Sequence, residues 1–159
     1  ADAPTKMALL ERFGYAFIRP EGSMYPPILD INDIDGDVKI DGPGGTLTFS
    51  HFLVNHGGMD ALGFRVNDVA YLPDVANIPD DVWPHLQGLR CWIVDALRRD
   101  PHPTHSHLDQ TLDWIKDMAP QEAVLTNMHN DLDYQTLRGE LPAHISPAYD
   151  GMTLNFEID

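Results

Sequence analysis

Short apolar runs alternate with helix-like segments in the second half of the chain, and this order limits the fold more than any other feature. Residues 91–94 form a continuous apolar run, as expected for a strand buried on both faces. Residues 123–126 form a second such run, and an amphipathic segment over 106–118 lies between them. Strands that alternate with helices predict a layered α/β sheet.

The remaining expected elements follow from apolar spacing and turn residues. The pattern predicts helices over 5–15, 79–86 and 134–141, and strands over 46–54, 61–66, 69–72 and 152–158. Residues 42–45 predict a turn or hairpin, and Asn67-Asp68 predicts a tight turn. Ser106 and Asp109 resemble a capping box at the start of the helix over 106–118. A length of 159 residues without repeats predicts a single domain over 1–159.

The charge balance limits the class of partner. Acidic residues outnumber basic ones by 25 to 10, which gives a net charge of -15. This excess argues against a coat for long nucleic acids or a binder of anionic membranes, since both need clustered Lys and Arg. A small phosphorylated substrate is compatible, because a bound metal inverts the local field. The chain has no apolar run of membrane-spanning length, and its one cysteine, Cys91, forms no internal disulfide. We therefore expect a cytoplasmic location.

Metal-ligating side chains follow several of the predicted strands. His56 follows a strand-like run, Asp74 comes just after the run over 69–72, and His129 lies three residues after another run. The carboxyl ends of strands in α/β sheets meet at one edge, where ligand sites gather. Imidazole and carboxylate groups together suit Zn or Mn. His105 and His107 lie at the start of the helix predicted over 106–118.

Each of these residues also has a structural interpretation. Asp74 follows Pro73 and suits a turn, and the histidines near residue 105 suit a solvated loop. Asp95 ends an apolar run, so its carboxylate either makes a structural hydrogen bond or orients a metal ligand. The sequence contains no H-E-x-x-H, paired C-x-x-C, G-x-S-x-G or Walker loop. Residue spacing alone leaves both interpretations open.

Several stretches, in the same order, resemble a known family. They are L-G-F-R at 62–65, D-V-A-Y-L-P-D-V at 68–75, V-D-A-L-R at 94–98, H-P-T-H at 102–105, L-T-N-M-H at 125–129, D-L-D-Y at 131–134 and P-A-Y-D-G-M at 147–152. Together they resemble the later half of metallo-β-lactamase-fold hydrolases. The similar branch is the phosphodiesterase-like one, which includes the cyclic-phosphate phosphodiesterase of phosphonate breakdown.

The resemblance implies a fold, a cofactor and a reaction. The fold is an α/β protein of the αβ/βα metallo-β-lactamase-like sandwich type, of which this chain is the carboxyl-terminal half. The cofactor is a pair of divalent metal ions, Zn or Mn. His56, Asp74 and His129 are then metal ligands, with Asp74 bridging both ions. His105 protonates the leaving oxygen, with His107 as the alternative, and the substrate is a small cyclic or nucleotide-like phosphodiester.

Two departures from the family pattern change these expectations. Many relatives carry His directly after Leu-Thr, where this chain has Asn127, and the signature H-x-H-x-D-H does not occur in the 159 residues. We therefore expect the chain alone to be inactive, with the missing half elsewhere. The alternatives are a catalytically silent binding or assembly module, which would cover its bare sheet by forming a homo-oligomer, and a small α/β protein whose histidines are incidental.

Overall fold

The computed structural model describes residues 1–156 and contains two compact units, which divide between Val38 and Lys39. The first unit contains helix α1 (Ala3–Phe17). The Asp2 carboxylate caps this helix by accepting a hydrogen bond of 3.1 Å from the Thr5 backbone N–H. The helix predicted over 5–15 is therefore confirmed. The expectation of a single domain over 1–159 stays a prediction.

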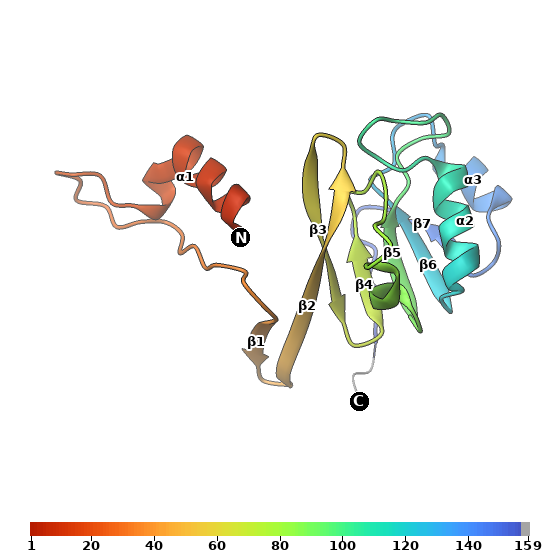
Figure 1. Ribbon diagram of the computed structural model, residues 1–159, viewed down its shortest axis with the longest axis horizontal. Helices are drawn as coiled ribbons and strands as arrows, with labels where there is room; N and C mark the ends of the chain where they lie inside the picture. The colour runs from red at the N-terminus through yellow and green to blue at the C-terminus, as the bar shows by residue number, and fades with distance from the viewer. Residues whose placement is uncertain (157–159) are drawn as a thin grey trace. The chain divides into compact units, whose positions relative to one another are not determined.

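A seven-stranded mixed sheet is the centre of the second unit (Figure 1). The strands lie side by side in chain order: β1 (Val38–Gly42), β2 (Gly45–His56), β3 (Met59–Val66), β4 (Val69–Leu72), β5 (Cys91–Asp95), β6 (Glu122–Thr126) and β7 (Ile145–Pro147). β2, β3 and β4 pair antiparallel, and β4 to β7 pair parallel. Consequently β2, β4, β5 and β6 run in the same direction, and their carboxyl ends lie at one edge.

The sequence pattern found most of these strands. The predicted runs over 46–54, 61–66, 69–72, 91–94 and 123–126 lie within β2 to β6, and Asn67 occupies the predicted tight turn with φ 51°. β1 and β7 were not predicted as strands, and the three residues of β7 are too few to show a period. The strand predicted over 152–158 is wrong for residues 152–156, which form no strand, and its last two residues lie outside the described part.

The helices of the second unit begin and end differently from the sequence expectation. Helix α2 (Leu108–Met118) has His107 as its N-cap, and the buried Ser106 hydroxyl donates to the Asp95 carbonyl instead. The predicted capping box is therefore wrong. Residues 79–86 form only the short 3-10 helix η1 (Trp83–Leu86), because Pro84 interrupts the α-helical hydrogen bonds. Helix α3 (Tyr134–Glu140) is as expected. No helix in residues 1–156 is long and apolar enough to cross a membrane.

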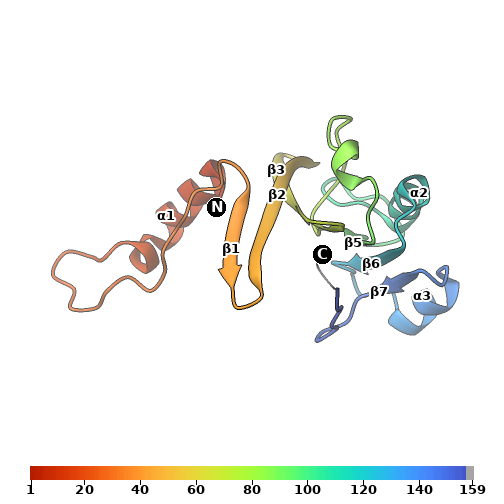
Figure 2. The same cartoon turned by 90° about the horizontal axis from the view of Figure 1, so that it is seen from below.

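One face of the sheet carries the hydrophobic core. Val54, Leu72 and Trp92 are buried on it, and they belong to the same cluster as Leu86 of η1 and Ile115 of α2. Figure 2 shows η1 and α2 on this side of β5 and β6. The loops that leave the carboxyl ends of these strands carry the candidate site.

Candidate metal site

Four strand ends bring polar side chains to one edge of the sheet. His56 is the last residue of β2, Asp74 lies two residues after β4, Asp95 ends β5 and Asn127 directly follows β6. Because these strands run in the same direction, their ends are neighbours in space although they are far apart in sequence. The predicted gathering of polar groups at this edge is therefore present.

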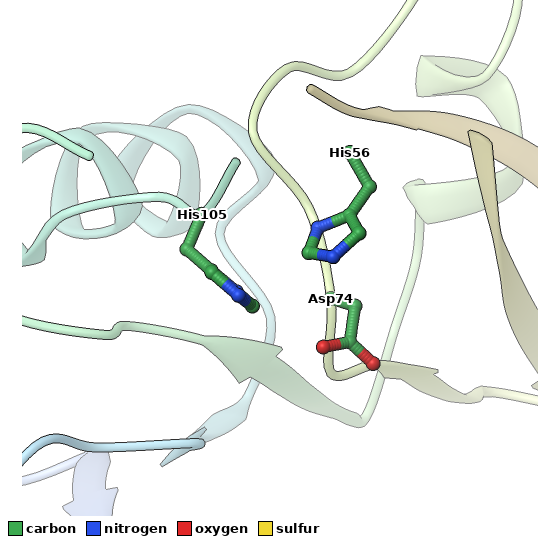
Figure 3. A group of neighbouring side chains, drawn as sticks. All are labelled: His56, Asp74 and His105. Atoms are coloured by element: carbon green, nitrogen blue, oxygen red, sulfur yellow. The ribbon is translucent and has the colours of Figure 1, made fainter. Parts of the chain in front are cut away.

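His56, Asp74 and His105 form a cluster at this edge (Figure 3). Each offers one ligand atom, and the three atoms lie within 4.8 Å of one another. The ring centroids of His56 and His105 are 4.5 Å apart, and the rings are nearly perpendicular at 76°. Figure 3 shows the His56 imidazole beside the Asp74 carboxylate, with His105 approaching from the other side. Zinc bonds of about 2.1 Å place two ligand atoms at most about 4.2 Å apart, so small side-chain shifts would close this set around one ion.

Backbone hydrogen bonds hold the loop that carries Asp74. The N–H groups of Ala76 and Asn77 donate to the Asn55 carbonyl, and the Asn55 N–H donates to the Asn77 carbonyl. The Ser106 N–H donates to the Val75 carbonyl. The loop of Asp74 is therefore tied both to the end of β2 and to the segment that carries His105.

Gly57 allows the segment before His105 to approach the end of β2. Its φ is +74°, a left-handed conformation that favours glycine. A Cβ at this position would lie 2.5 Å from Thr104 Cγ2 and 3.2 Å from the Pro103 carbonyl oxygen. Any other residue would push this segment away from His56.

A buried carboxylate lies behind His105. Asp95 has no exposed surface, and its Oδ2 lies 2.7 Å from His105 Nδ1 and accepts a 3.2 Å hydrogen bond from the Val75 N–H. Burial raises the pKa of Asp95, and the hydrogen bonds from His105 and Val75 oppose this rise. A carboxylate bonded to the far nitrogen of an imidazole is the arrangement that orients metal-ligating histidines. Of the two interpretations of Asp95, the contact with His105 favours the orienting one.

Two of the predicted site residues lie outside the cluster. The His129 imidazole is 59% exposed, and its Nδ1 lies 3.0 Å from Asp131 Oδ1. His107 Nδ1 lies 3.1 Å from Gln110 Oε1 in the first turn of α2. Within residues 1–156, neither joins His56 and Asp74 in the ligand set. The roles of His129 as ligand and of His107 as alternative proton donor stay predictions.

Sequence reasoning noted Asn127 only as a departure from the family. Its side-chain nitrogen lies 3.3 Å from Asp95 Oδ1, 3.4 Å from the Pro73 carbonyl oxygen and 3.2 Å from His105 Nδ1. The signal in the sequence was its position directly after an apolar run, which is also the position of Asp95.

His102 is a second imidazole beside His105. The ring centroids of the two residues are 5.4 Å apart, and the Thr104 N–H donates to His102 Nδ1 at 3.3 Å. Desolvation lowers the pKa of His102, and the positive charge of Arg98 adds to this effect. Both effects favour the neutral imidazole.

The cluster suits a divalent metal. Two imidazoles and one carboxylate are ligands that Zn and Mn accept. His56 Nδ1 is buried and has no hydrogen-bond partner within residues 1–156, so this nitrogen is not engaged elsewhere in the fold. The donor set and its geometry therefore fit the kind of ion that the family resemblance implies.

Comparison with known proteins gives one family and several relatives. Residues 1–128 match the model of the beta-lactamase superfamily domain. A diphosphatase from the PhnP family is 30% identical with a TM-score of 0.84, over 99% of this chain and 58% of that chain. Zn(2+)-bound PqqB from Methylobacterium extorquens has a TM-score of 0.61 at 16% identity, over 80% of this chain and 56% of that chain.

An octanoyltransferase of Porphyromonas gingivalis is 28% identical over 149 residues, which are 91% of this chain and 29% of that protein. The chain therefore spans less than two thirds of each of these relatives. The likeness to PqqB shows the fold alone. Together with the mixed sheet, the matches confirm the expected α/β fold of the metallo-β-lactamase type.

Proposed function

The chain belongs to the beta-lactamase superfamily, as its resemblance predicted, and from this premise we propose that it supplies His56, Asp74 and His105 to the active site of a metal-dependent phosphodiesterase. The observation that carries the proposal is the cluster itself, whose three ligand atoms lie within 4.8 Å of one another at the carboxyl edge of the sheet. The 30% identity to a diphosphatase over nearly the whole chain supports chemistry at phosphorus.

The proposed substrate is a small cyclic or nucleotide-like phosphodiester. A net charge of -15 opposes the approach of a long polyanion, whereas one phosphate is compensated locally by a bound cation. A divalent ion at the cluster would neutralise phosphate charge and make water a nucleophile near neutral pH. Zn and Mn both suit the ligand set, with a second ion held by residues outside this chain in the complete protein.

His105 has two roles that depend on the context. If the chain binds an ion with its own residues alone, His105 would be the third ligand beside His56 and Asp74. In a two-metal enzyme whose other ligands come from elsewhere, His105 would be the proton donor to the leaving oxygen, because a histidine beside the reacting group can exchange protons near neutral pH. In both roles the Asp95 carboxylate holds the ring by its Nδ1.

Zinc binding by the 159-residue chain tests the ligand set directly. We expect Asp74→Ala to weaken zinc affinity at least tenfold by isothermal titration calorimetry, because one of three ligands is lost. Asp81→Ala is the matched control, since it removes the same charge from an exposed position outside the cluster. Equal affinity of the unaltered chain and Asp74→Ala would contradict the proposed ligand role.

Hydrolysis tests the activity, and it requires the longest native protein that contains this chain. With Mn or Zn, we expect that protein to hydrolyse bis(p-nitrophenyl) phosphate and a small cyclic phosphodiester, and Asp74→Ala to abolish turnover. Metal binding without hydrolysis of any phosphodiester would instead favour the silent binding module.

A further inference from the structure

Asn127 joins three parts of the candidate site through one side-chain amide. Its nitrogen lies within hydrogen-bond distance of Asp95 Oδ1 at the end of β5 and of the Pro73 carbonyl, next to Asp74. Thus Asn127 contacts the two strand ends that carry Asp95 and Asp74, although its own backbone follows a third strand, β6.

The amide has two N–H donors, and the two oxygens use both of them. The reversed orientation would place the amide oxygen against Asp95 Oδ1 and the Pro73 carbonyl oxygen, which are acceptors only, so the contacts themselves fix which way the amide points. The Asn127 nitrogen also lies 3.2 Å from His105 Nδ1. This contact is not a third hydrogen bond of the amide, because Nδ1 carries the proton that it donates to Asp95 Oδ2 and so cannot accept one.

The backbone of Asn127 is suited to this position. Its φ is +59°, in the left-handed region that Asn enters more readily than most residues. Hydrogen bonds on both sides hold the turn, because the Ala96 N–H donates to the Thr126 carbonyl and the His129 N–H donates to the Leu97 carbonyl. The amide is therefore presented to Asp95 by a fixed turn.

We propose that Asn127 is a positioning residue. It holds Asp95 Oδ1, so that Oδ2 remains directed at His105 Nδ1–H and the imidazole keeps one tautomer, with the lone pair on Nε2 available to a metal ion. The bond to the Pro73 carbonyl keeps the Asp74 loop in register with that imidazole. The amide of Asn127 thus braces the neighbouring groups of the site. The inference rests on the proposed metal site, and it concerns the geometry of the chain before an ion binds.

Asn127→Gly removes the amide and keeps the left-handed backbone accessible. Asn67→Gly is the matched control, because Asn67 also has positive φ but lies at the start of β4, whereas the site lies beyond its end. Asp95→Asn provides a reference for a lost acceptor, since replacing the carboxylate behind a histidine by an amide imposes the wrong tautomer. Circular dichroism checks that each variant folds.

Two measurements on the 159-residue chain decide the proposal. Long-range ¹H–¹⁵N NMR of the metal-free chain should show His105 protonated on Nδ1 alone, and a mixture of tautomers in Asn127→Gly. Cobalt titration should give roughly tenfold weaker affinity for Asn127→Gly, the order of loss found when partners of metal-bound histidines are removed. Asn67→Gly should match the unaltered chain in both.

The proposal is overturned by Nε2 protonation of His105 in the unaltered chain, or by a folded Asn127→Gly variant with unchanged tautomer and cobalt affinity. Failure of the phosphodiesterase proposal would give a different result. The longest native protein would not hydrolyse phosphodiesters, or the unaltered chain would not bind cobalt, but His105 of the unaltered chain would still carry its proton on Nδ1.

Discussion

Gly57 is the residue whose side-chain size the candidate site tolerates least. The space where its Cβ would lie is occupied by Thr104, in the segment that leads to His105. Gly58, the next residue, has nothing within 4 Å of a Cβ and no positive φ. Of these two adjacent glycines, only Gly57 determines how closely the segment of His105 approaches that of His56.

We expect Gly57→Ala to lower zinc affinity about tenfold or more, because a displaced Thr104 carries His105 away from His56. The left-handed backbone adds a cost of roughly 1–2 kcal/mol to folding, seen as a lower Tm. Gly58→Ala is the matched control and should change neither quantity. Zinc titration and thermal unfolding check the pair, and equal behaviour of the two variants would show that the close approach is unimportant.

The sequence predicted the site residues unequally, for reasons that differ by residue. His56 and Asp74 could be found because each follows a strand whose apolar run is plain. The position of His105 before a predicted helix was noted, but its role came from the resemblance, and only its contact with Asp95 shows how the ring is held. The contacts of Asn127 could not be predicted, because its partners lie at two other strand ends that no local pattern connects to it.

Helix ends were the least predictable elements. Ser106 lies where a capping residue is expected, but its hydroxyl donates to the Asp95 carbonyl, and the buried Thr111 hydroxyl donates to the same oxygen. The buried Asp95 carbonyl must be paired with a donor, and the Ser106 hydroxyl pairs with it instead of capping the first backbone N–H groups of α2. Hydrogen bonds to the end of β5, rather than a local capping pattern, therefore engage Ser106 at the start of α2.

Helix α3 has a capping interaction that depends on pH. Asp133 accepts hydrogen bonds from the Thr136 hydroxyl and backbone N–H, and these bonds lower the pKa of Asp133. A carboxyl group with a lower pKa in the folded state stabilises the fold above its unfolded pKa, and this contribution is lost as the pH falls through the folded pKa.

We expect Asp133→Ala to lower the Tm at pH 7 by roughly 2–4 °C, the scale of one helix cap in a chain of this size. The difference from the unaltered chain should shrink as the pH falls below about 4, where the carboxylate begins to protonate. Asp133→Asn keeps a cap that does not titrate, so its Tm should vary less between pH 7 and pH 3. Thermal unfolding at several pH values checks this, and a difference that grows on acidification would contradict it.

For the whole molecule, metal binding should be coupled to folding. His56, Asp74 and His105 come from three separate segments, so only the folded chain brings them together. An ion that binds this state alone stabilises it by about 2.7 kcal/mol at a free concentration 100 times its dissociation constant.

We therefore expect zinc to raise the Tm of the chain, and EDTA to reverse the rise. His56→Ala should abolish the effect, whereas His144→Ala, which removes an exposed histidine outside the cluster, should preserve it. Differential scanning fluorimetry measures the Tm of the unaltered chain with zinc and after EDTA, and the Tm of each of the two variants with zinc. A zinc-induced rise that survives in His56→Ala would place the ion elsewhere on the chain.

The sequence by itself determined the strands β2 to β6 and the edge of the sheet at which polar groups collect, because the apolar pattern of a strand is a local property. The family followed separately, from the motifs that resemble it. The tertiary structure decided which of those groups meet. It brought His105 to His56 and Asp74, left His129 exposed beside Asp131, and turned the Asn127 amide toward Asp95. Such contacts depend on loop paths between strand ends, and these are fixed by long-range hydrogen bonds and packing that a single sequence does not display.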